Sequence, residues 1–289
     1  MIPFDFARAK TLDTALDFLA EHGRTTRIIA GGTDLIVELR ALATGEEGPE
    51  HVLDITPMKS LRGIEDDGRT VTIGALTTHG EVAGSAVIKK NAPLLAKACS
   101  TVGAVQHRNI ATIGGNIINA SPAADSVPAL IALDAEAMFA SKRGERTSLL
   151  KDIFVKPYKT DIEADELLIG VRFQKLPPGA RTSFHKLARR NALAISRMNV
   201  AVVIVLGGGK IIEARIAPGS ATPMPDRIAI AEEILLGKEP SEELFRLAGE
   251  KVSEEMIKRS GVRWSTPYKK PVIEALTARA LREAAGKEA

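Results

Sequence analysis

The chain has 289 residues, of which 45% are hydrophobic and 26% charged, a balance typical of a globular protein rather than a disordered one. Its 39 Lys and Arg residues are scattered among 36 Asp and Glu residues, which leaves a net charge of +3, and only 4% of residues are aromatic; this composition does not indicate a nucleic-acid-binding surface. The single cysteine, Cys99, excludes an internal disulfide and, without a CxxC motif, a zinc or iron–sulfur site built within this chain.

Two further observations favour a cytoplasmic protein. The first ten residues, MIPFDFARAK, lack an apolar core of signal-peptide length. No later run approaches the ~18 apolar residues that a membrane-spanning helix needs. We therefore expect a cytoplasmic location.

The first predicted elements surround a pair of glycines, Gly31 and Gly32. Periodicity and capping signals predict a helix over residues 11–22, a short buried strand over 26–30 and a second helix over 34–42. Glycine leaves room for an anion beside bare backbone N–H groups, although a single Gly-Gly pair is more often an ordinary tight turn. Thr33 could add a hydroxyl donor, and Asp34 could cap the second helix or bind a sugar hydroxyl.

Strand and helix patterns then alternate. Strands are predicted over residues 51–55, 61–64, 70–74, 136–141, 146–149 and 167–173, with turns at 66–68 and 142–145. A short helix is expected after Thr78, and another over residues 93–100, where a proline occupies the first helical position. Cys99 lies on this second helix, and we interpret it as a small buried residue rather than a reactive thiol.

Residues 102–125 show no sustained period of either kind, and an irregular segment of this length in a compact domain is usually functional. Their second part reads NIATIGGNIINASPAAD and contains a second glycine pair, Gly114 and Gly115, beside the hydroxyl of Thr112. Asp125 could bind sugar hydroxyls or cap a helix over the apolar residues that follow it, and the residues alone leave both roles open. Further polar candidates for ligand contacts are His107, Arg108, Asn116 and Asn119.

The sequence LPPG at residues 176–179 interrupts all periodicity and is the best candidate for a domain boundary. Beyond it, strands are predicted over residues 182–187, 200–206 and 211–216, and helices over 229–236, 242–259 and 268–285. The GGGK sequence between the last two strands is interpreted as a hairpin turn, because strands flank it and no Ser or Thr follows the lysine. The segment KLARRNALAIS could present Lys186 or Ile195 to a ligand held against the first domain.

Four stretches of the chain together resemble the FAD-binding medium subunit of the xanthine dehydrogenase and carbon monoxide dehydrogenase family of molybdenum hydroxylases. They are AGGTDL at residues 30–35, TIGGN at 112–116, the NASPAAD that follows and the KLARRNALAIS segment. The resemblance covers essentially the whole chain. It implies an α+β fold: a PCMH-type (vanillyl-alcohol-oxidase-like) FAD-binding domain of two subdomains over residues 1–176, and a smaller C-terminal α+β domain over 180–289, with a three-stranded antiparallel sheet and helices.

The resemblance also implies which residues contact FAD. Two loops would surround the FAD pyrophosphate, Asp125 would contact the ribose or polyhydroxyl portion, and Ile195 would lie near the isoalloxazine. The full expected set is Ile28, Ile29, Ala30, Gly31, Gly32, Thr33, Asp34, Leu35, Val102, Thr112, Ile113, Gly114, Gly115, Asn116, Asp125, Leu168, Lys186 and Ile195. No catalytic side chain and no metal ligand is expected in this chain.

The function implied is electron transfer within a complex. The resemblance implies that this chain binds FAD, that a large partner subunit carries the molybdopterin cofactor, and that a small partner subunit carries the [2Fe–2S] clusters. The assembly is expected to be a dimer of heterotrimers. Electrons would pass from the clusters through FAD to an external acceptor. Two alternatives are a stand-alone PCMH-fold flavin oxidoreductase and an assembly or storage module that binds a nucleotide without redox turnover.

Overall fold

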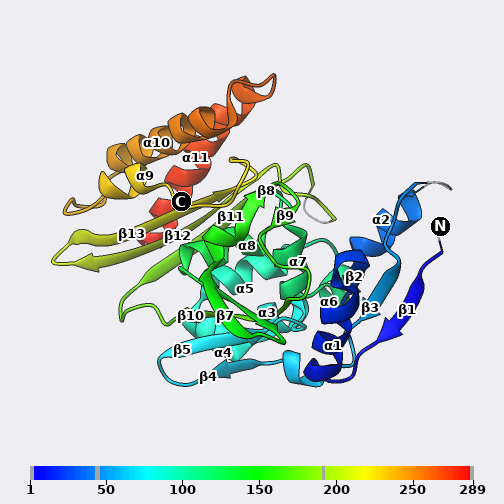
Figure 1. Ribbon diagram of the computed structural model, residues 1–289. Helices are drawn as coiled ribbons and strands as arrows, with labels where there is room; N and C mark the ends of the chain where they lie inside the picture. Colours follow the sequence, from blue (N-terminus) through cyan, green and yellow to red (C-terminus); the bar gives the residue numbers. More distant parts are fainter. Residues whose placement is uncertain (1–2, 43–45, 191–192, 287–289) are drawn as a thin grey trace.

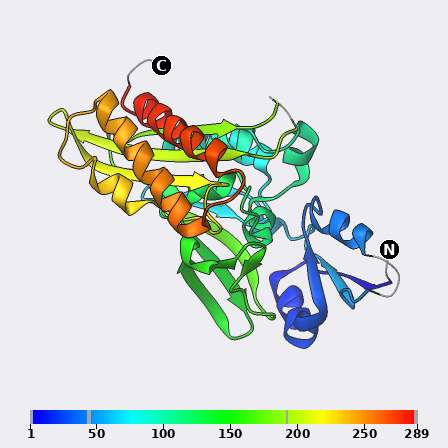
Figure 2. The ribbon, with the colours of Figure 1, turned by 90° about the horizontal axis from the view of Figure 1, so that it is seen from above.

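The computed structural model describes residues 3–42, 46–190 and 193–286. Figures 1 and 2 show a small N-terminal lobe beside a larger body, with the C-terminal helices packed on the far side of that body. Residues 191 and 192, which belong to the predicted ligand-presenting segment 186–196, lie outside the described residues. Within the described ranges no helix is long and apolar enough to cross a membrane.

The N-terminal lobe is a three-stranded parallel sheet in the order β1-β3-β2 with two helices. Its elements are β1 (Asp5–Arg8), α1 (Leu12–His22), η1 (Gly23–Thr25), β2 (Thr26–Ile29), α2 (Leu35–Ala41), β3 (His51–Asp54) and η2 (Lys59–Leu61). Thr11 caps α1 as predicted, since its hydroxyl accepts the Thr14 N–H and the Thr14 hydroxyl accepts the Thr11 N–H. Leu16 and Leu19 of α1 are buried against Leu53 of β3 in the core of the lobe.

The central unit is built on an antiparallel sheet in the order β4-β5-β10-β6-β7. Its strands are β4 (Ile64–Asp66), β5 (Thr70–Gly74), β6 (Glu136–Ser141), β7 (Gly144–Leu149) and β10 (Leu167–Gln174), with η3 (Leu150–Ile153) and a two-stranded ribbon, β8 (Phe154–Lys156) and β9 (Lys159–Thr160). Its helices are α3 (His79–Gly84), α4 (Ala86–Asn91), α5 (Pro93–Ser100), α6 (Val105–Ile110), α7 (Ile113–Asn119) and α8 (Ser126–Ala132). The predicted hairpins at 66–68 and 142–145 are confirmed.

The prediction that residues 102–125 are irregular is wrong. This segment contains two short helices, α6 and α7, which a period search misses because each has fewer than two turns. Thr112 caps α7, its hydroxyl accepting the Gly115 N–H, so the glycine pair lies in the first turn of a helix rather than in a loop before one.

The C-terminal unit is an antiparallel sheet in the order β11-β12-β13, covered on one face by three helices (Figures 1 and 2). Its elements are β11 (Arg181–Leu187), β12 (Met198–Gly207), β13 (Lys210–Gly219), α9 (Ala229–Glu233), α10 (Glu242–Ser260) and α11 (Thr266–Ala284). Residues 198–205 of β12 are all buried, because Val200, Val202 and Ile204 face the helices while Ala201 and Val203 face the central unit. The GGGK hairpin turn is confirmed.

An ion pair between a buried carboxylate and a partly exposed guanidinium fixes the start of β10. The Glu166 carboxylate, 5% exposed, accepts hydrogen bonds from Arg146 Nε and Nη2 at 2.6 and 2.7 Å and from the Glu163 N–H at 3.0 Å. The guanidinium of Arg146 also lies 4.1 Å from the ring centroid of Phe139. Hydrogen bonding to Arg146 lowers the pKa of Glu166.

We expect Glu166→Gln to lower the free energy of unfolding at neutral pH by about 1–3 kcal/mol, because a charged hydrogen-bonded pair is lost from a buried position. Since the folded pKa of Glu166 lies below its unfolded value of 4.5, the stability that Glu166 confers is present above that unfolded value and is lost as the pH falls below it through the folded pKa. Urea unfolding from pH 3 to pH 7 checks this. The wild type and the variant should converge at the acid end, whereas the exposed Glu145→Gln should match the wild type throughout.

Candidate functional site

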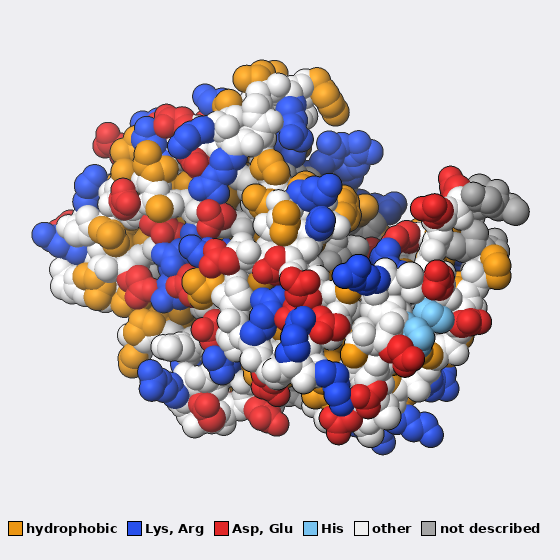
Figure 3. Space-filling view, in the orientation of Figure 1, with side chains coloured by type: hydrophobic (Ala, Val, Ile, Leu, Met, Phe, Trp, Pro, Cys, Tyr) orange, Lys and Arg blue, Asp and Glu red, His pale blue; other side chains and the backbone are white. Residues whose placement is uncertain are grey.

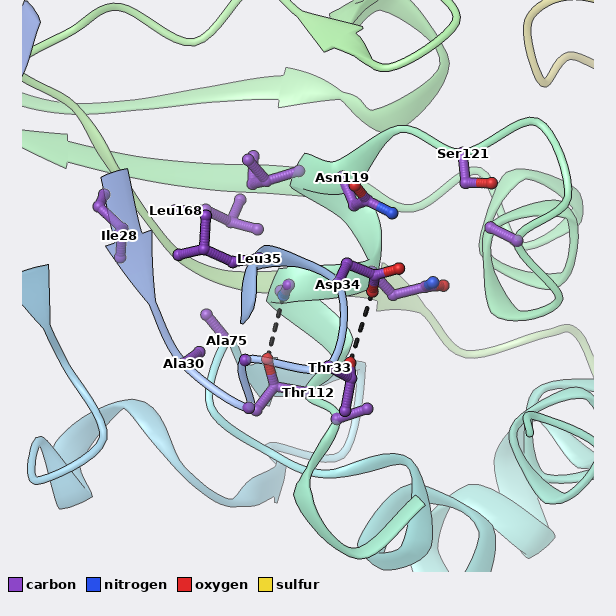
Figure 4. Close-up of a pocket in the computed structure, with 18 of the residues that line it drawn as sticks. Ile28, Ala30, Thr33, Asp34, Leu35, Ala75, Thr112, Asn119, Ser121 and Leu168 are labelled. Atoms are coloured by element: carbon purple, nitrogen blue, oxygen red, sulfur yellow. Dashed lines mark hydrogen bonds between the residues drawn. The ribbon is translucent and has the colours of Figure 1, made fainter. Parts of the chain in front are cut away.

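A cavity of about 760 Å³ lies between the N-terminal lobe and the central unit, with part of its rim from residues 193–195 of the C-terminal unit. Figure 3 shows the molecule hollowed between the lobe that carries α2 and the rest of the body. This volume falls in the upper part of the range of roughly 300–1,000 Å³ that small-molecule and cofactor sites occupy. The close-up in Figure 4 shows side chains from both glycine segments, including Thr33 and Thr112, around the same space.

The first glycine segment offers unpaired backbone donors at the cavity wall. Gly31, Gly32 and Thr33 line the cavity, and their N–H groups donate to no acceptor in the part of the chain that the structure describes. Gly32 has φ of +68°, a conformation that side chains disfavour. A Cβ on Gly31 would lie 2.1 Å from the Ile110 carbonyl oxygen, so glycine is what lets this turn rest against the end of α6.

The second glycine segment uses its N–H groups differently. Ile113 donates to the Thr77 carbonyl and Gly114 to the Ala75 carbonyl, each at 2.9 Å, while Gly115 and Asn116 donate to Thr112. These N–H groups therefore have protein acceptors, in contrast to those of the first segment. A Cβ on Gly114 would lie 2.7 Å from the Ala75 carbonyl oxygen, which makes Gly114 a packing requirement.

Gly115 borders open space. An added Cβ there would meet only Thr112 Oγ1, at 3.0 Å, with no other heavy atom within 4 Å. Because Gly115 also lines the cavity, a side chain at this position would project into the volume available to a ligand. The absence of a side chain at Gly115 therefore leaves this part of the cavity open.

Asp125 does not act as the helix cap that was one of its two predicted roles. It precedes α8, but its carboxylate makes no capping hydrogen bond there. Instead Oδ2 accepts from Lys186 Nζ at 2.5 Å, and Oδ1 accepts from the Ser196 hydroxyl at 2.6 Å and from Asn199 Nδ2 at 3.1 Å. Burial raises the pKa of Asp125, against the lowering effect of the Lys186 ammonium.

This network ties the C-terminal unit to the central unit beside the cavity. Lys186 Nζ also donates to the Thr101 carbonyl at 2.9 Å, and the Lys186 and Asp125 side chains are only 9% and 7% exposed. Asp125 lines the cavity, whereas Lys186 lies behind it. The geometry makes Lys186 the partner that holds Asp125 in place.

The structure brings together almost all of the predicted site residues. The exceptions, which do not line the cavity, are Ile29, Ile113 and Lys186. Ile29 packs against the small core of Leu35, Leu39 and Val52, and Ile113 is fully buried in the central core. Residues that do line the cavity are Ile28, Ala30, Gly31, Gly32, Thr33, Asp34, Leu35, Val102, Thr112, Gly114, Gly115, Asn116, Asp125, Leu168 and Ile195.

Several lining residues were not anticipated. They come from the end of β5, the start of α3, the β8–β9 ribbon and the segment before β10, and include Ala75, Leu76, His79, Tyr158, Ile162, Glu163, Ala164 and Glu166. No glycine motif marks these segments. Those at the end of β5 and before β10 lie close together because β5 and β10 are neighbours in the sheet. Of the two basic candidates, His107 lines the cavity, while Arg108 Nη1 donates to the Val102 carbonyl at 2.9 Å and supports that segment.

Comparison with known proteins gives family matches over both parts of the chain. A family model described as the FAD binding domain in molybdopterin dehydrogenase matches residues 2–175, and one described as the CO dehydrogenase flavoprotein C-terminal domain matches residues 183–284. The glyceraldehyde dehydrogenase medium chain of Sulfolobus acidocaldarius is 34% identical, over 98% of each chain. The xanthine dehydrogenase FAD-binding subunit of Escherichia coli O157:H7 is 32% identical, over 97% of each.

Solved structures agree with these matches. A carbon monoxide dehydrogenase from Hydrogenophaga pseudoflava, in a form that lacks the Mo-pyranopterin moiety of the molybdenum cofactor, superposes with a TM-score of 0.90 at 29% identity, covering 100% of both chains. Quinoline 2-oxidoreductase from Pseudomonas putida 86 superposes with a TM-score of 0.89 at 26% identity, covering 99% of this chain and 98% of that one. The predicted fold, a FAD-binding domain followed by a C-terminal domain with a three-stranded antiparallel sheet, is confirmed.

The buried network yields a stability prediction. Lys186→Met would leave the Asp125 carboxylate buried without its cation, so we expect the free energy of unfolding to fall by about 3–5 kcal/mol. Lys142→Met is the matched control: Lys142 Nζ lies 2.6 Å from Asp17 Oδ1, but both side chains are exposed, so its loss should change stability by less than about 1 kcal/mol. Denaturant unfolding of the flavin-free chain measures both. Equal losses in the two variants would contradict the assignment of Lys186 as a buried partner.

Proposed function

Because the chain belongs to the family of FAD-binding medium subunits of molybdenum hydroxylases, we propose that it holds FAD in the cavity between its two glycine segments and passes electrons between partner subunits and an external acceptor. The family's flavoprotein subunits are parts of oxidoreductases. The observation that carries the proposal is the run of three N–H groups, at Gly31, Gly32 and Thr33, that have no acceptor among the described residues. All three residues line the cavity, and Gly115 leaves open space in the same wall.

The residues present fit this cofactor. Unpaired N–H groups on a glycine turn are suited to the oxygens of a diphosphate. The hydroxyl of Thr33 and the carboxylate of Asp34 stand beside them, 3.4 Å apart, and can serve a phosphate and a sugar hydroxyl respectively. Apolar side chains of Ile28, Leu35 and Leu168 line another part of the wall, as Figure 4 shows, and suit the faces of flat ring systems.

Within this arrangement the chain's own residues bind and orient. Gly31, Gly32 and Thr33 would bind the diphosphate. The carboxylate of Asp125, which Lys186 and Ser196 hold in place, would accept a further hydrogen bond from the cofactor. Ile195 lines the cavity but is 79% exposed, so it lies where the cofactor site opens to solvent or to a partner. The same set of eighteen residues predicted from the sequence is our proposed FAD site, with Ile29, Ile113 and Lys186 acting from behind the wall.

Held there by these residues, FAD would supply one- and two-electron redox chemistry, suited to electron transfer from [2Fe–2S] clusters in a small subunit to an external acceptor. Relatives named as medium chains support the view that this chain works beside a molybdopterin-binding large subunit and an iron–sulfur small subunit. We further propose that the assembly is a dimer of heterotrimers and that the chain divides into domains over residues 1–176 and 180–289.

A second possible function is that of a stand-alone flavin oxidoreductase of the same fold. Such an enzyme needs a proton donor or acceptor at the cofactor. Of the two described histidines at the cavity, His107 is exposed and His79 is buried with a pKa lowered to about 4, mainly by burial. Neither histidine is placed as an evident acid–base group, so these two side chains give the stand-alone enzyme no support.

Copurification of the chain with its partner subunits tests the proposed function. The tagged chain should copurify with two further polypeptides, one large and one small, and the complex should contain molybdenum, iron and FAD in fixed ratios. Its flavin absorbance should bleach when an oxidisable substrate of the large subunit is added without an acceptor. Substrate turnover by this chain alone would instead support the stand-alone enzyme, and flavin that no acceptor reoxidises would indicate a storage role.

The cavity geometry predicts the effect of filling it. Gly115→Val would place its side chain in the cavity, so FAD content should fall from one per chain to less than about a tenth, while the chain stays folded. Gly208→Asn is the control, because Gly208 has φ of +58° in the β12–β13 turn, which Asn tolerates, and lies outside the cavity lining. Absorbance of released flavin per chain measures both. Full flavin content in Gly115→Val would remove the second glycine segment from the FAD site.

A further inference from the structure

The connection between α10 and α11 exposes large side chains that proteins usually bury. Val262, Trp264 and Tyr268, which we call the apolar tip, are 82%, 92% and 50% exposed, and Trp264 is the only tryptophan of the chain. The backbone turns between them, since the Thr266 N–H donates to the Arg263 carbonyl at 2.9 Å. Figure 3 shows hydrophobic and basic side chains together at the top of the view, where this connection lies in Figure 1. Exposed apolar side chains that gather in one place mark interaction sites.

The charge around the apolar tip is positive and is only partly compensated. Residues 256–273 contain five lysines and arginines and no acidic residue. Three cations, Arg197, Arg263 and Lys269, have no carboxylate partner in the described part of the chain; we call them the cation cluster. The pKa of Lys269 is lowered, first by burial and then by the charges of Arg263 and Arg197, which indicates that the three lie near one another. An acidic surface would supply the missing counter-charge.

The cation cluster is connected to the rim of the cavity. Lys269 Nζ donates to the Ser220 carbonyl at 2.8 Å, and the Ser220 hydroxyl donates to the Ser196 carbonyl at 3.3 Å. Ser196 lies between Arg197 of the cluster and Ile195, which lines the cavity and is 79% exposed. A protein that covers the cation cluster is therefore placed beside the mouth of the cavity, where an electron donor has to approach bound FAD.

Two other occupants of this surface are less suited. In a two-fold contact between copies of this chain the same patch faces itself, so the two cation clusters would repel each other. An anionic membrane attracts aromatic and basic side chains as well, but the relatives that are named as medium chains favour a protein partner.

We propose that the apolar tip and the cation cluster form a docking surface for an acidic, partly apolar face of the iron–sulfur small subunit. This inference rests on the proposed function, to which it adds the place where the electron donor binds this chain. Trp264 fills a pocket of the partner, as tryptophan often does at the centre of an interface, and the cation cluster sets the orientation and the rate of association. Docking therefore weakens as the salt concentration rises.

Photo-cross-linking in the assembled complex tests which subunit covers the apolar tip. With p-benzoylphenylalanine in place of Trp264, the chain should still fold, because this side chain is 92% exposed. The chain is coexpressed with both partner subunits, and irradiation should cross-link it to the small subunit, which mass spectrometry identifies. The same group in place of Ile212, which is 60% exposed on β13, is the control and should not give this cross-link. A cross-link from position 264 to the large subunit, to a second copy or to lipid, or none at all, overturns the proposal.

Two variants measure the energetic part of the contact. Trp264→Gln and Arg263→Glu should each raise the dissociation constant of this chain from the complex roughly tenfold, and Arg263→Glu should also reduce its salt dependence. Ile212→Gln and Lys210→Glu, on the β12–β13 hairpin, are the matched controls and should stay within about twofold of the wild type. Mass photometry of the diluted complex gives the dissociation constants, and released flavin and the thermal unfolding midpoint should be unchanged in all four.

The outcomes separate this inference from the proposed function. Losses in Trp264→Gln and Arg263→Glu that do not exceed those of their controls overturn the docking surface while the complex itself stands. A wild-type chain that copurifies with no other subunit contradicts the proposed function and the docking surface together.

Discussion

The site depends on two places where one backbone rests directly on another. Gly31 lies against the carbonyl of Ile110, and Gly114 lies against the carbonyl of Ala75, at separations that a Cβ would not allow. The first contact joins the N-terminal lobe to the end of α6, and the second joins α7 to the end of β5. Interiors are close-packed and tolerate little added volume, so a methyl group at either place would move a segment that shapes the cavity. The glycines at these positions are therefore needed to build the wall, whatever they also offer a ligand.

The strands and the longer helices could be predicted from the sequence because their patterns are local. Three examples are the continuous apolar run of β12, the capping residue Thr11 and the glycine-rich turn after β12, each of which contains enough information within a few residues. The short helices α6 and α7 could not, because six or seven residues are too few to give a helical stripe, and the glycines of α7 and the asparagines of both helices are poor helix formers. Their helical form depends on tertiary contacts, such as those of the Ile113 and Gly114 N–H groups with the chain before α3.

Much of the candidate site was predictable for a similar reason. Glycine pairs and the residues around them mark the first and second segments, and the residues alone also suggest Asp125 and Ile195. The family resemblance adds Val102 and Leu168 and favours the binding role of Asp125 over the capping role. The sequence carries no sign that the two segments would treat their N–H groups differently, since that depends on which carbonyls the fold brings near. It also gives no sign of His79 or Tyr158, whose approach to the cavity depends on β5, α3 and the β8–β9 ribbon being placed around one space.

The walls of the cavity belong to three units whose buried clusters run partly from one unit into the next. The N-terminal lobe buries Leu16, Leu19 and Leu53, the central unit buries the faces of β5 and β10, and the C-terminal unit reaches the rim through the segment after β11. A molecule that contacts all three units binds most tightly when the units keep their relative positions. By thermodynamic linkage, the binding free energy that it gains from those contacts also opposes separation of the units. If the cofactor binds in this cavity as proposed, it would act as an internal cross-link, and the resistance of the chain to proteolysis between its units would then depend on the occupancy of the cavity.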